Sequence, residues 1–442
     1  MQKQIPEENP KRWMSPFFTI WTGQAVSLLG SQLVQFALVW WLTQKTGSAT
    51  VLATASLVAL LPQVLLGPIT GALVDRWNRR LVLIVADTSI ALATFGLALL
   101  FWLGDVQIWH VYLLLFARAV GGGFHWPAMQ ASTSLMVPKE HLARIQGLNQ
   151  VLSGAMNIGA APLGAVLLGV LPMQGILAID VITASIAVFP LLFIPIPQPE
   201  RSAAAESAPG KASLWHDLLA GFRYVWAWPG LMLIVLMATL INFMLAPASA
   251  LQPLLVTKHF NGQAMQLAWM ETAWGIGMLA GGLTLSAWGG FRRRILTSLA
   301  GLLVLGAGMA CIGLLPASGY WVAVGILFFV GFSLPIVNGP LLAVVQAVVA
   351  PDMQGRVFTL ISSAASAMMP LSLLAAGPIA DSIGVQSWYV LAGLATALIG
   401  LAAFFVPAII HIEENHGQAQ AAPEIGDKQP ALAAQPAELG GD

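Results

Sequence analysis

Long stretches of apolar residues recur along the chain and are separated by short polar segments. Residues 17–41 and 51–74, for example, contain no Asp, Glu, Lys or Arg. Each stretch is long enough to cross a hydrocarbon core of about 30 Å as a helix, which takes roughly 20 residues. Because the apolar residues are continuous and do not alternate with polar ones, they predict helices and not the strands of a membrane barrel.

The pattern predicts twelve membrane-spanning helices. We expect them at residues 17–41, 50–73, 81–103, 109–135, 146–171, 175–196, 230–252, 266–288, 295–315, 320–349, 357–380 and 386–410. A charged segment separates two groups of six helices. The expected divisions are a first half at residues 1–197, a cytoplasmic linker at 198–228, a second half at 229–410 and a disordered cytoplasmic tail at 411–442.

The two halves also share landmarks at a constant offset. Pro127 and Pro138 are separated by the same interval as Pro340 and Pro351, and the second pair is offset from the first by 213 residues. The arginine pair at 79–80 matches the pair at 292–293 at the same offset. Duplicated units are common in membrane transporters. The expected fold class is therefore an all-α integral membrane protein with two pseudo-symmetric six-helix bundles.

Composition and charge support this assignment and indicate how the chain is oriented in the membrane. Hydrophobic residues make up 57% of the chain and charged residues 9%, whereas a soluble domain carries about 25% charge. Of the nineteen Lys and Arg residues, only Lys45 and Lys258 fall on the side opposite the termini, and Arg118 lies within a helix. This bias predicts that both termini are cytoplasmic. A net charge of zero gives no reason to expect a nucleic-acid partner.

The most specific motif follows the second predicted helix and runs from Gly71 to Arg80 as G-A-L-V-D-R-W-N-R-R. Gly71 permits close helix packing, and Asp75 can cap a neighbouring helix or pair with an arginine. A basic loop held in the cytoplasm by its charge is the simpler alternative. The motif resembles the cytoplasmic loop motif of the major facilitator superfamily. This resemblance implies the fold of that superfamily and a conformational latch made of Gly71, Asp75, Arg76, Arg79 and Arg80.

Three charged residues inside predicted helices are candidates for proton coupling or for binding a substrate amine. The segment that begins at Arg118 resembles the superfamily's R-x-x-x-G motif, which implies a role in coupling, with a structural ion pair as the alternative. Asp180 and Glu271 each lie about one turn from the outer end of a helix. Burial favours the neutral form of a carboxyl, so either acid could carry a proton, unless it is hydrated from outside. Asp87 is expected to be structural.

Polar residues within the helices are candidates to line a central cavity, although each alone could equally make a hydrogen bond between helices. They are Gln24, Gln32, Gln35, His125, Asn157, Asn242 and Asn338. No phosphate-binding loop and no catalytic set are recognisable in the sequence. We therefore expect neither an enzyme nor a cofactor, and a proton gradient as the energy source.

Further stretches in both halves resemble the Mef-type macrolide efflux branch of the superfamily. They include Phe124-His-Trp-Pro-Ala128, His259-Phe-Asn-Gly262 and Gly277-Met-Leu-Ala-Gly-Gly282. The resemblance implies drug/proton antiport with alternating access, by a monomer that exports a macrolide-like small molecule across the bilayer. The fifth helix departs from the superfamily's antiport pattern, because Ala161 replaces a glycine before proline. Export of another amphiphile, such as a siderophore or lysophospholipid, and a non-transporting scaffold or sensor are the alternatives.

Overall fold

The computed structural model describes residues 13–198, 222–351 and 353–413. In the part of the chain that it describes, twelve long helices confirm the predicted all-α fold. The first six are α1 (Met14–Thr46), α2 (Ala49–Arg76), α3 (Arg79–Leu103), α4 (Ile108–Met136), α5 (Leu142–Val170) and α6 (Met173–Phe193). The second six are α8 (Pro229–Leu254), α9 (Ala264–Trp288), α10 (Arg294–Leu314), α11 (Tyr320–Val348), α12 (Gln354–Ile383) and α13 (Val385–Ala403).

Short helical segments join some of these helices. They are η1 (Lys139–His141), η3 (Leu255–His259), η4 (Ala317–Gly319) and α14 (Pro407–Ile410). The last predicted helix, at residues 386–410, is interrupted, because α13 ends at Ala403 and Pro407 starts the separate α14. A proline lacks the N–H that would continue the first helix. Most of the predicted linker and of the predicted tail lies outside the described residues.

Ten of the helices in the described residues are long and apolar enough to cross a membrane by length and composition. The two long helices that are not among these ten, α4 and α9, carry Arg118 and Glu271. Large apolar side chains are exposed on the outside of the bundles, among them Trp102 at 71% and Leu283 at 73%. Such a surface is stable in lipid and not in water, so the chain is a multi-pass membrane protein.

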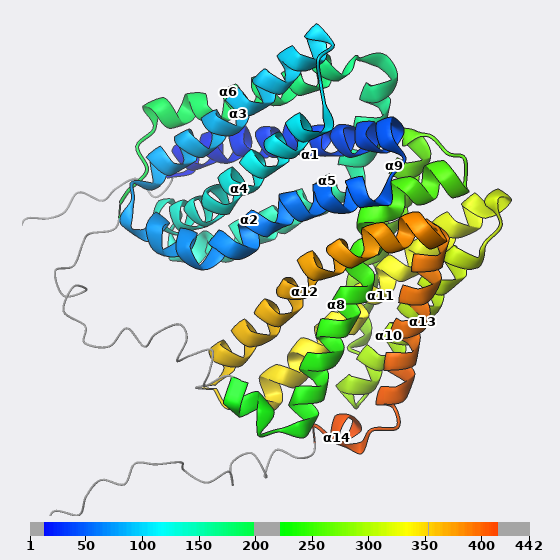
Figure 1. The fold of residues 1–442 in the computed structure, drawn as a ribbon. Helices are drawn as coiled ribbons and strands as arrows, with labels where there is room; N and C mark the ends of the chain where they lie inside the picture. The colour runs from blue at the N-terminus through cyan, green and yellow to red at the C-terminus, as the bar shows by residue number, and fades with distance from the viewer. Residues whose placement is uncertain (1–12, 199–221, 352, 414–442) are drawn as a thin grey trace, which may run out of the picture.

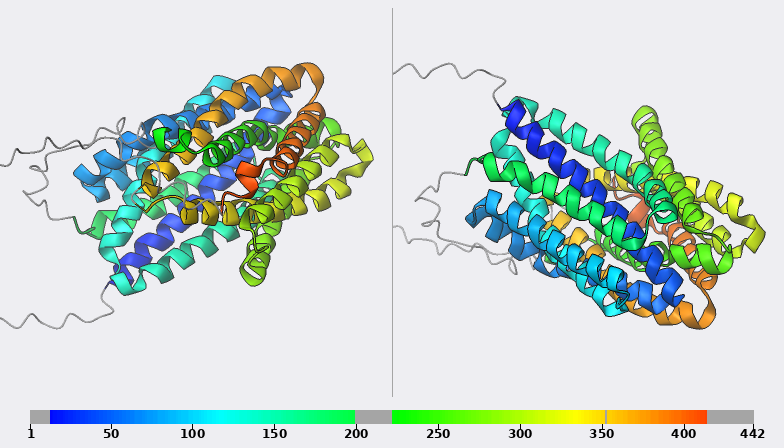
Figure 2. Two further views of the ribbon diagram at one scale, coloured as in Figure 1. Left: turned by 90° about the horizontal axis from the view of Figure 1, so that it is seen from below. Right: turned by 90° about the horizontal axis from the view of Figure 1, so that it is seen from above.

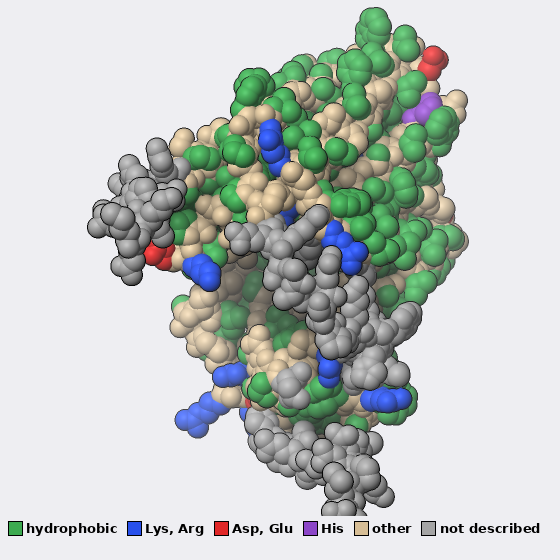
Figure 3. Space-filling model, turned by 90° about the vertical axis from the view of Figure 1, so that its left-hand side faces the viewer, with side chains coloured by type: hydrophobic (Ala, Val, Ile, Leu, Met, Phe, Trp, Pro, Cys, Tyr) green, Lys and Arg blue, Asp and Glu red, His purple; other side chains and the backbone are tan. Residues whose placement is uncertain are grey.

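The helices form two bundles, one of α1–α6 and one of α8–α13 (Figure 1). The bundles meet along α2 and α12 and along α5 and α9. From this junction they diverge towards the ends of the helices at which α1 begins and α13 finishes (Figure 1), and in the views from below and from above the two bundles partly overlap (Figure 2). We call this the open end. Figure 3 views it face on, with several Lys and Arg side chains gathered there.

The opposite end of the molecule, where α1 finishes and α2 begins, is closed by contacts between the bundles. Asp381, near the last residue of α12, accepts hydrogen bonds from the backbone N–H of Ala49 (2.7 Å) and of Thr50 (2.9 Å) and from the Ser48 hydroxyl (2.9 Å). One turn earlier, a Cβ added to Gly377 would lie 2.8 Å from the Cα of Thr50. The start of α2 is therefore capped by a carboxylate from the other half of the molecule.

Within the second bundle, glycines allow α9 and α11 to pack backbone against backbone. A Cβ added to Gly277 would lie 2.0 Å from the carbonyl oxygen of Phe328, and one added to Gly281 would lie 2.0 Å from that of Phe332. Close approach of this kind is the usual way in which membrane helices associate, because lipid provides no hydrophobic driving force. Gly277 and Gly281 of this stretch are thus explained by packing, whereas a Cβ added to Gly282 would meet nothing within 4 Å.

Candidate functional site

A cavity of about 670 Å³ lies between the two bundles. This volume is within the range of roughly 300–1,000 Å³ that is typical of small-molecule sites. Most of the wall is apolar. Phe36 and Met156 contribute from the first bundle, and Trp274, Met309 and Met369 contribute from the second. A wall of aromatic and thioether groups can adapt to large ligands of varied shape.

Glu271, on α9, is the only charged side chain among the residues that line this cavity. In the described part of the chain, no residue forms a hydrogen bond or an ion pair with its carboxylate. An ionised group in apolar surroundings is stable only when it is paired or solvated. The carboxylate is therefore available to a cationic group of a bound molecule.

Three of the predicted cavity residues, Gln32, Gln35 and Asn157, line this cavity. Gln252 lines it as well and was missed, although it is a polar residue within a predicted helix and so carries the same signal as Gln32. Its Nε2 atom is buried without a hydrogen-bond partner. Because an unsatisfied buried donor is costly, this amide is suited to a hydrogen-bond acceptor on a ligand.

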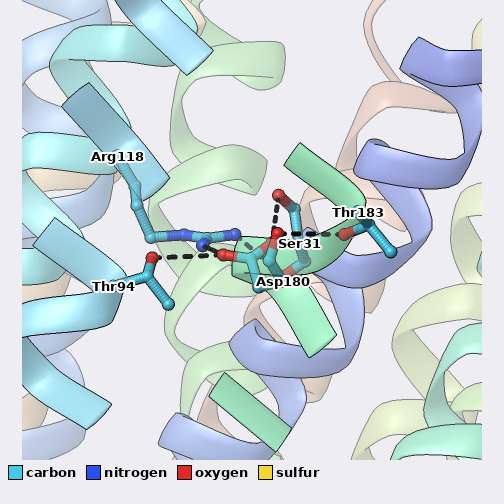
Figure 4. A network of polar contacts seen from close by, with 5 residues as sticks. All are labelled: Ser31, Thr94, Arg118, Asp180 and Thr183. Atoms are coloured by element: carbon cyan, nitrogen blue, oxygen red, sulfur yellow. Dashed lines mark hydrogen bonds and ion pairs between the residues drawn. The ribbon is translucent and has the colours of Figure 1, made fainter. Parts of the chain in front are cut away.

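Arg118 and Asp180, both predicted as site residues, form an ion pair inside the first bundle (Figure 4). The Arg118 Nη1 atom lies 2.7 Å from Asp180 Oδ2, and Nη2 donates to the carbonyl oxygen of Ser31 at 2.9 Å. The hydroxyls of Ser31 and Thr94 donate to the same carboxylate at 3.0 and 3.1 Å. Asp180 is 1% exposed, and neither member of the pair is among the cavity-lining residues. A substrate in the cavity would thus meet Glu271 and not Asp180.

A second buried cluster in the first bundle joins Gln24, Asp87 and His125. Gln24 Nε2 donates to Asp87 Oδ2 at 2.9 Å, and Gln24 Oε1 lies 2.8 Å from His125 Nε2. The same imidazole nitrogen lies 3.4 Å from Asp87 Oδ1. Gln24 and His125, predicted to line the cavity, are not among its lining residues, because their side chains are directed to Asp87.

The remaining two predicted cavity residues are also absent from its wall. Asn242 donates to the carbonyl oxygen of Ala238 at 2.8 Å, one turn earlier in its own helix. Asn338 is exposed. A polar residue in a membrane helix therefore has several ways to satisfy its hydrogen bonds, and sequence position alone does not distinguish them.

The arginines of the predicted latch contact the first bundle. Arg79 is buried and donates to the carbonyl oxygen of Ala131 at 3.3 Å. Arg80 donates to the carbonyl oxygens of Leu191 and Leu192 near the end of α6, while Arg76 is exposed. The surroundings of Gly71 and the side chain of Asp75, the other two predicted latch residues, lie outside the described part of the structure. The latch therefore stays a prediction.

Comparison with known proteins gives a consistent result. The sequence profile of the Major Facilitator Superfamily matches residues 20–373. Macrolide efflux protein A of Streptococcus pyogenes is 36% identical over 387 residues, which cover 87% of this chain and 94% of that protein. Macrolide efflux protein A of Enterococcus faecalis is 34% identical over 328 residues, which cover 74% of this chain and 100% of that protein. A solved structure of a variant of the nucleoside transporter NupG has a TM-score of 0.67 at 12% identity, and the match covers 88% of this chain and 98% of that chain.

Proposed function

The chain belongs to the Major Facilitator Superfamily, in the branch of the macrolide efflux proteins, and on this basis we propose that it exports macrolide antibiotics in exchange for protons. The relatives of this branch support the substrate class, because they are macrolide efflux proteins that align with most of the chain. The arrangement of two bundles around a cavity supports a transport mechanism in which each side opens in turn.

The observation that carries the proposal is the single carboxylate in the cavity wall. A macrolide is large and mostly apolar, and it has one amine that is cationic at neutral pH. Glu271 would bind this amine within an apolar cavity of about 670 Å³. A proton that neutralises Glu271 would remove the attraction and release the drug. Competition between amine and proton for one carboxylate couples the two movements.

The same arrangement supports a direction of transport from the inner to the outer side. With the termini in the cytoplasm, as the distribution of Lys and Arg indicates, the open end takes up drug from the inner side. Protonation of Glu271 from the outer side, after the bundles have rocked, would discharge the drug. The cavity and the buried ion pair are complete within one chain, which supports a monomer in the cytoplasmic membrane.

The cavity wall disfavours one alternative substrate class. An anionic siderophore would be bound by Lys or Arg, and neither is among the residues that line the cavity. The buried carboxylate would repel such a ligand. A cationic amphiphile therefore fits the wall better than an anionic one.

The proposal is tested by the erythromycin susceptibility of a hypersensitive bacterial host that expresses the chain. We expect the chain to raise resistance and Glu271→Gln to abolish the increase, because a hydrogen bond to a charged group contributes about 1.5–3 kcal/mol, or roughly 10–150-fold in affinity. Glu140→Gln is the matched control, since the Glu140 side chain is 78% exposed. If correctly inserted protein gives no gain in resistance, macrolides are excluded as substrates. If Glu271→Gln gives full resistance, the Glu271 carboxylate is excluded as the group that binds the drug.

A further inference from the structure

The two polar clusters of the first bundle are stacked at a regular spacing. One residue from each of α1, α3 and α4 belongs to each cluster, and the two residues on any one helix are seven positions apart. Seven residues are about two helical turns, or about 10 Å along the axis, so the clusters form two layers. The layer nearer the open end holds Gln24, Asp87 and His125, and the next holds Ser31, Thr94 and Arg118 together with Asp180 of α6.

The hydrogen bonds of the layer nearer the open end determine where a proton can bind. An ionised carboxylate only accepts hydrogen bonds, so the Gln24 amide must present its NH₂ group to Asp87. Its oxygen then faces His125 Nε2, and this nitrogen carries a hydrogen whether the ring is neutral or charged. The proton that decides the charge of the ring is therefore the one on Nδ1 of His125.

The two layers differ in what they can exchange. Arg118 keeps its proton at any accessible pH, so the Arg118–Asp180 pair is a permanently charged unit. Both acid–base groups of the other layer can change their protonation, and histidine does so in the physiological range. Asp87 is 6% exposed and the His125 side chain is 23% exposed, so the carboxylate is buried and the imidazole is partly exposed. The charged groups nearest to Asp87 are His125 in its own layer and the Arg118–Asp180 pair one layer away.

We propose that Gln24, Asp87 and His125 form a proton-binding site that loads and releases one proton in each transport cycle, apart from the drug cavity. The inference rests on the proposed antiport. Loading converts a site of net charge −1, with neutral His125 and ionised Asp87, into a neutral one. The change occurs between α1, α3 and α4, one layer from the fixed Arg118–Asp180 pair, so it alters the electrostatics where these helices pack.

The test uses the purified full chain in proteoliposomes and two readouts. One is the proton movement that added erythromycin drives, followed with an entrapped pH indicator, and the other is erythromycin exchange without a pH gradient. We expect Asp87→Asn to lower the number of protons moved per drug by about half, because Glu271 still exchanges its own proton whereas His125 loses the neighbouring carboxylate that favours its charged form, and to leave exchange intact. Asp105→Asn, at an exposed acid beyond the end of α3, should behave as the wild type.

His125→Gln provides the second variant, because glutamine can still donate to Gln24 but cannot ionise. Its coupled transport should lose the part of the wild-type pH dependence that comes from the imidazole, a change that a purely structural role would not produce. If both variants show the wild-type ratio of protons to drug and the wild-type pH profile, the proposed proton-binding site is wrong, while the antiport itself is unaffected. A wild-type chain that moves erythromycin without protons would instead overturn the antiport itself, and the site with it. If Asp87→Asn does not fold, the His125→Gln profile alone decides.

Discussion

In this structure, the end of the molecule where α1 finishes and α2 begins is closed. The substitution Asp381→Ala removes a carboxylate from this end and should favour the conformation in which the end is open. The carboxylate caps two backbone N–H groups of α2 and binds the Ser48 hydroxyl across the bundles. Loss of a cap costs about 0.5–2 kcal/mol, and the attraction between an anion and a helix N-terminus adds about 0.3–1 kcal/mol. Because Asp381 is exposed, we expect a total of about 1–2 kcal/mol, which changes the ratio of two states by a factor of about 5–30.

Distance measurements between spin labels can detect this change. Suitable positions are Asp105→Cys in the first bundle and Ser318→Cys in the second, which are both exposed at the closed end. The free Cys311 is exposed and would be replaced by serine. In Asp381→Ala, the ratio of the population with the longer distance to the population with the shorter distance should increase by the factor given above.

The control for this experiment is Ser382→Ala, because the Ser382 hydroxyl donates to the carbonyl oxygen of Ile379 in its own helix. It should leave the distance distribution unchanged. The same distribution in Asp381→Ala and in the wild type would refute the idea that the carboxylate holds the bundles together. Unequal effects of Asp381→Ala and Asp381→Asn would separate the charge from the hydrogen bonds.

Two further substitutions probe the interior of the protein. Asp180→Asn leaves the Arg118 guanidinium buried without its partner, which typically destabilises a protein by about 3–5 kcal/mol, so thermal unfolding in detergent should shift to lower temperature; an unchanged unfolding temperature would mean that the pair is solvated. Gln252→Leu removes a buried amide nitrogen without a partner, so we expect equal or higher stability together with roughly 2- to 10-fold weaker erythromycin binding, since hydrogen bonds contribute about 0.5–1.5 kcal/mol. Equal drug affinity in this variant and the wild type, measured by calorimetry, would show that no ligand atom uses the amide.

The twelve helices were predictable because lipid leaves the backbone few alternatives, so that a long apolar stretch is sufficient to define a helix. The end of the last helix could not be predicted, because the apolar stretch continues through residues 404–410 although the helix breaks there before α14. Hydropathy measures transfer to lipid and is the same for a helix and for a short break within it. Pro407 was the only local indication of this break.

The functional residues were only partly predictable, because their partners come from distant helices. Glu271 could be selected as a buried acid, and it lines the cavity. Asp180 was selected for the same reason, but it pairs with the guanidinium of Arg118, which lies 62 residues away in sequence. Asp87 was expected to be structural, and only its contacts with Gln24 and His125 suggest more. Hydropathy and motif patterns cannot report which polar groups meet inside a bundle.

Selection for a new substrate would act very differently on the two kinds of residue in the cavity wall. The apolar side chains come from helices of both bundles, and each touches only a small part of a large ligand. Substitution of one, such as Met156 or Met309, would change preferences gradually within a lineage. Glu271 has no second acid in the wall to replace it. With the proposed role of Glu271, gradual divergence among cationic antibiotics is accessible, whereas a change to anionic compounds requires one abrupt step that first abolishes the ancestral activity.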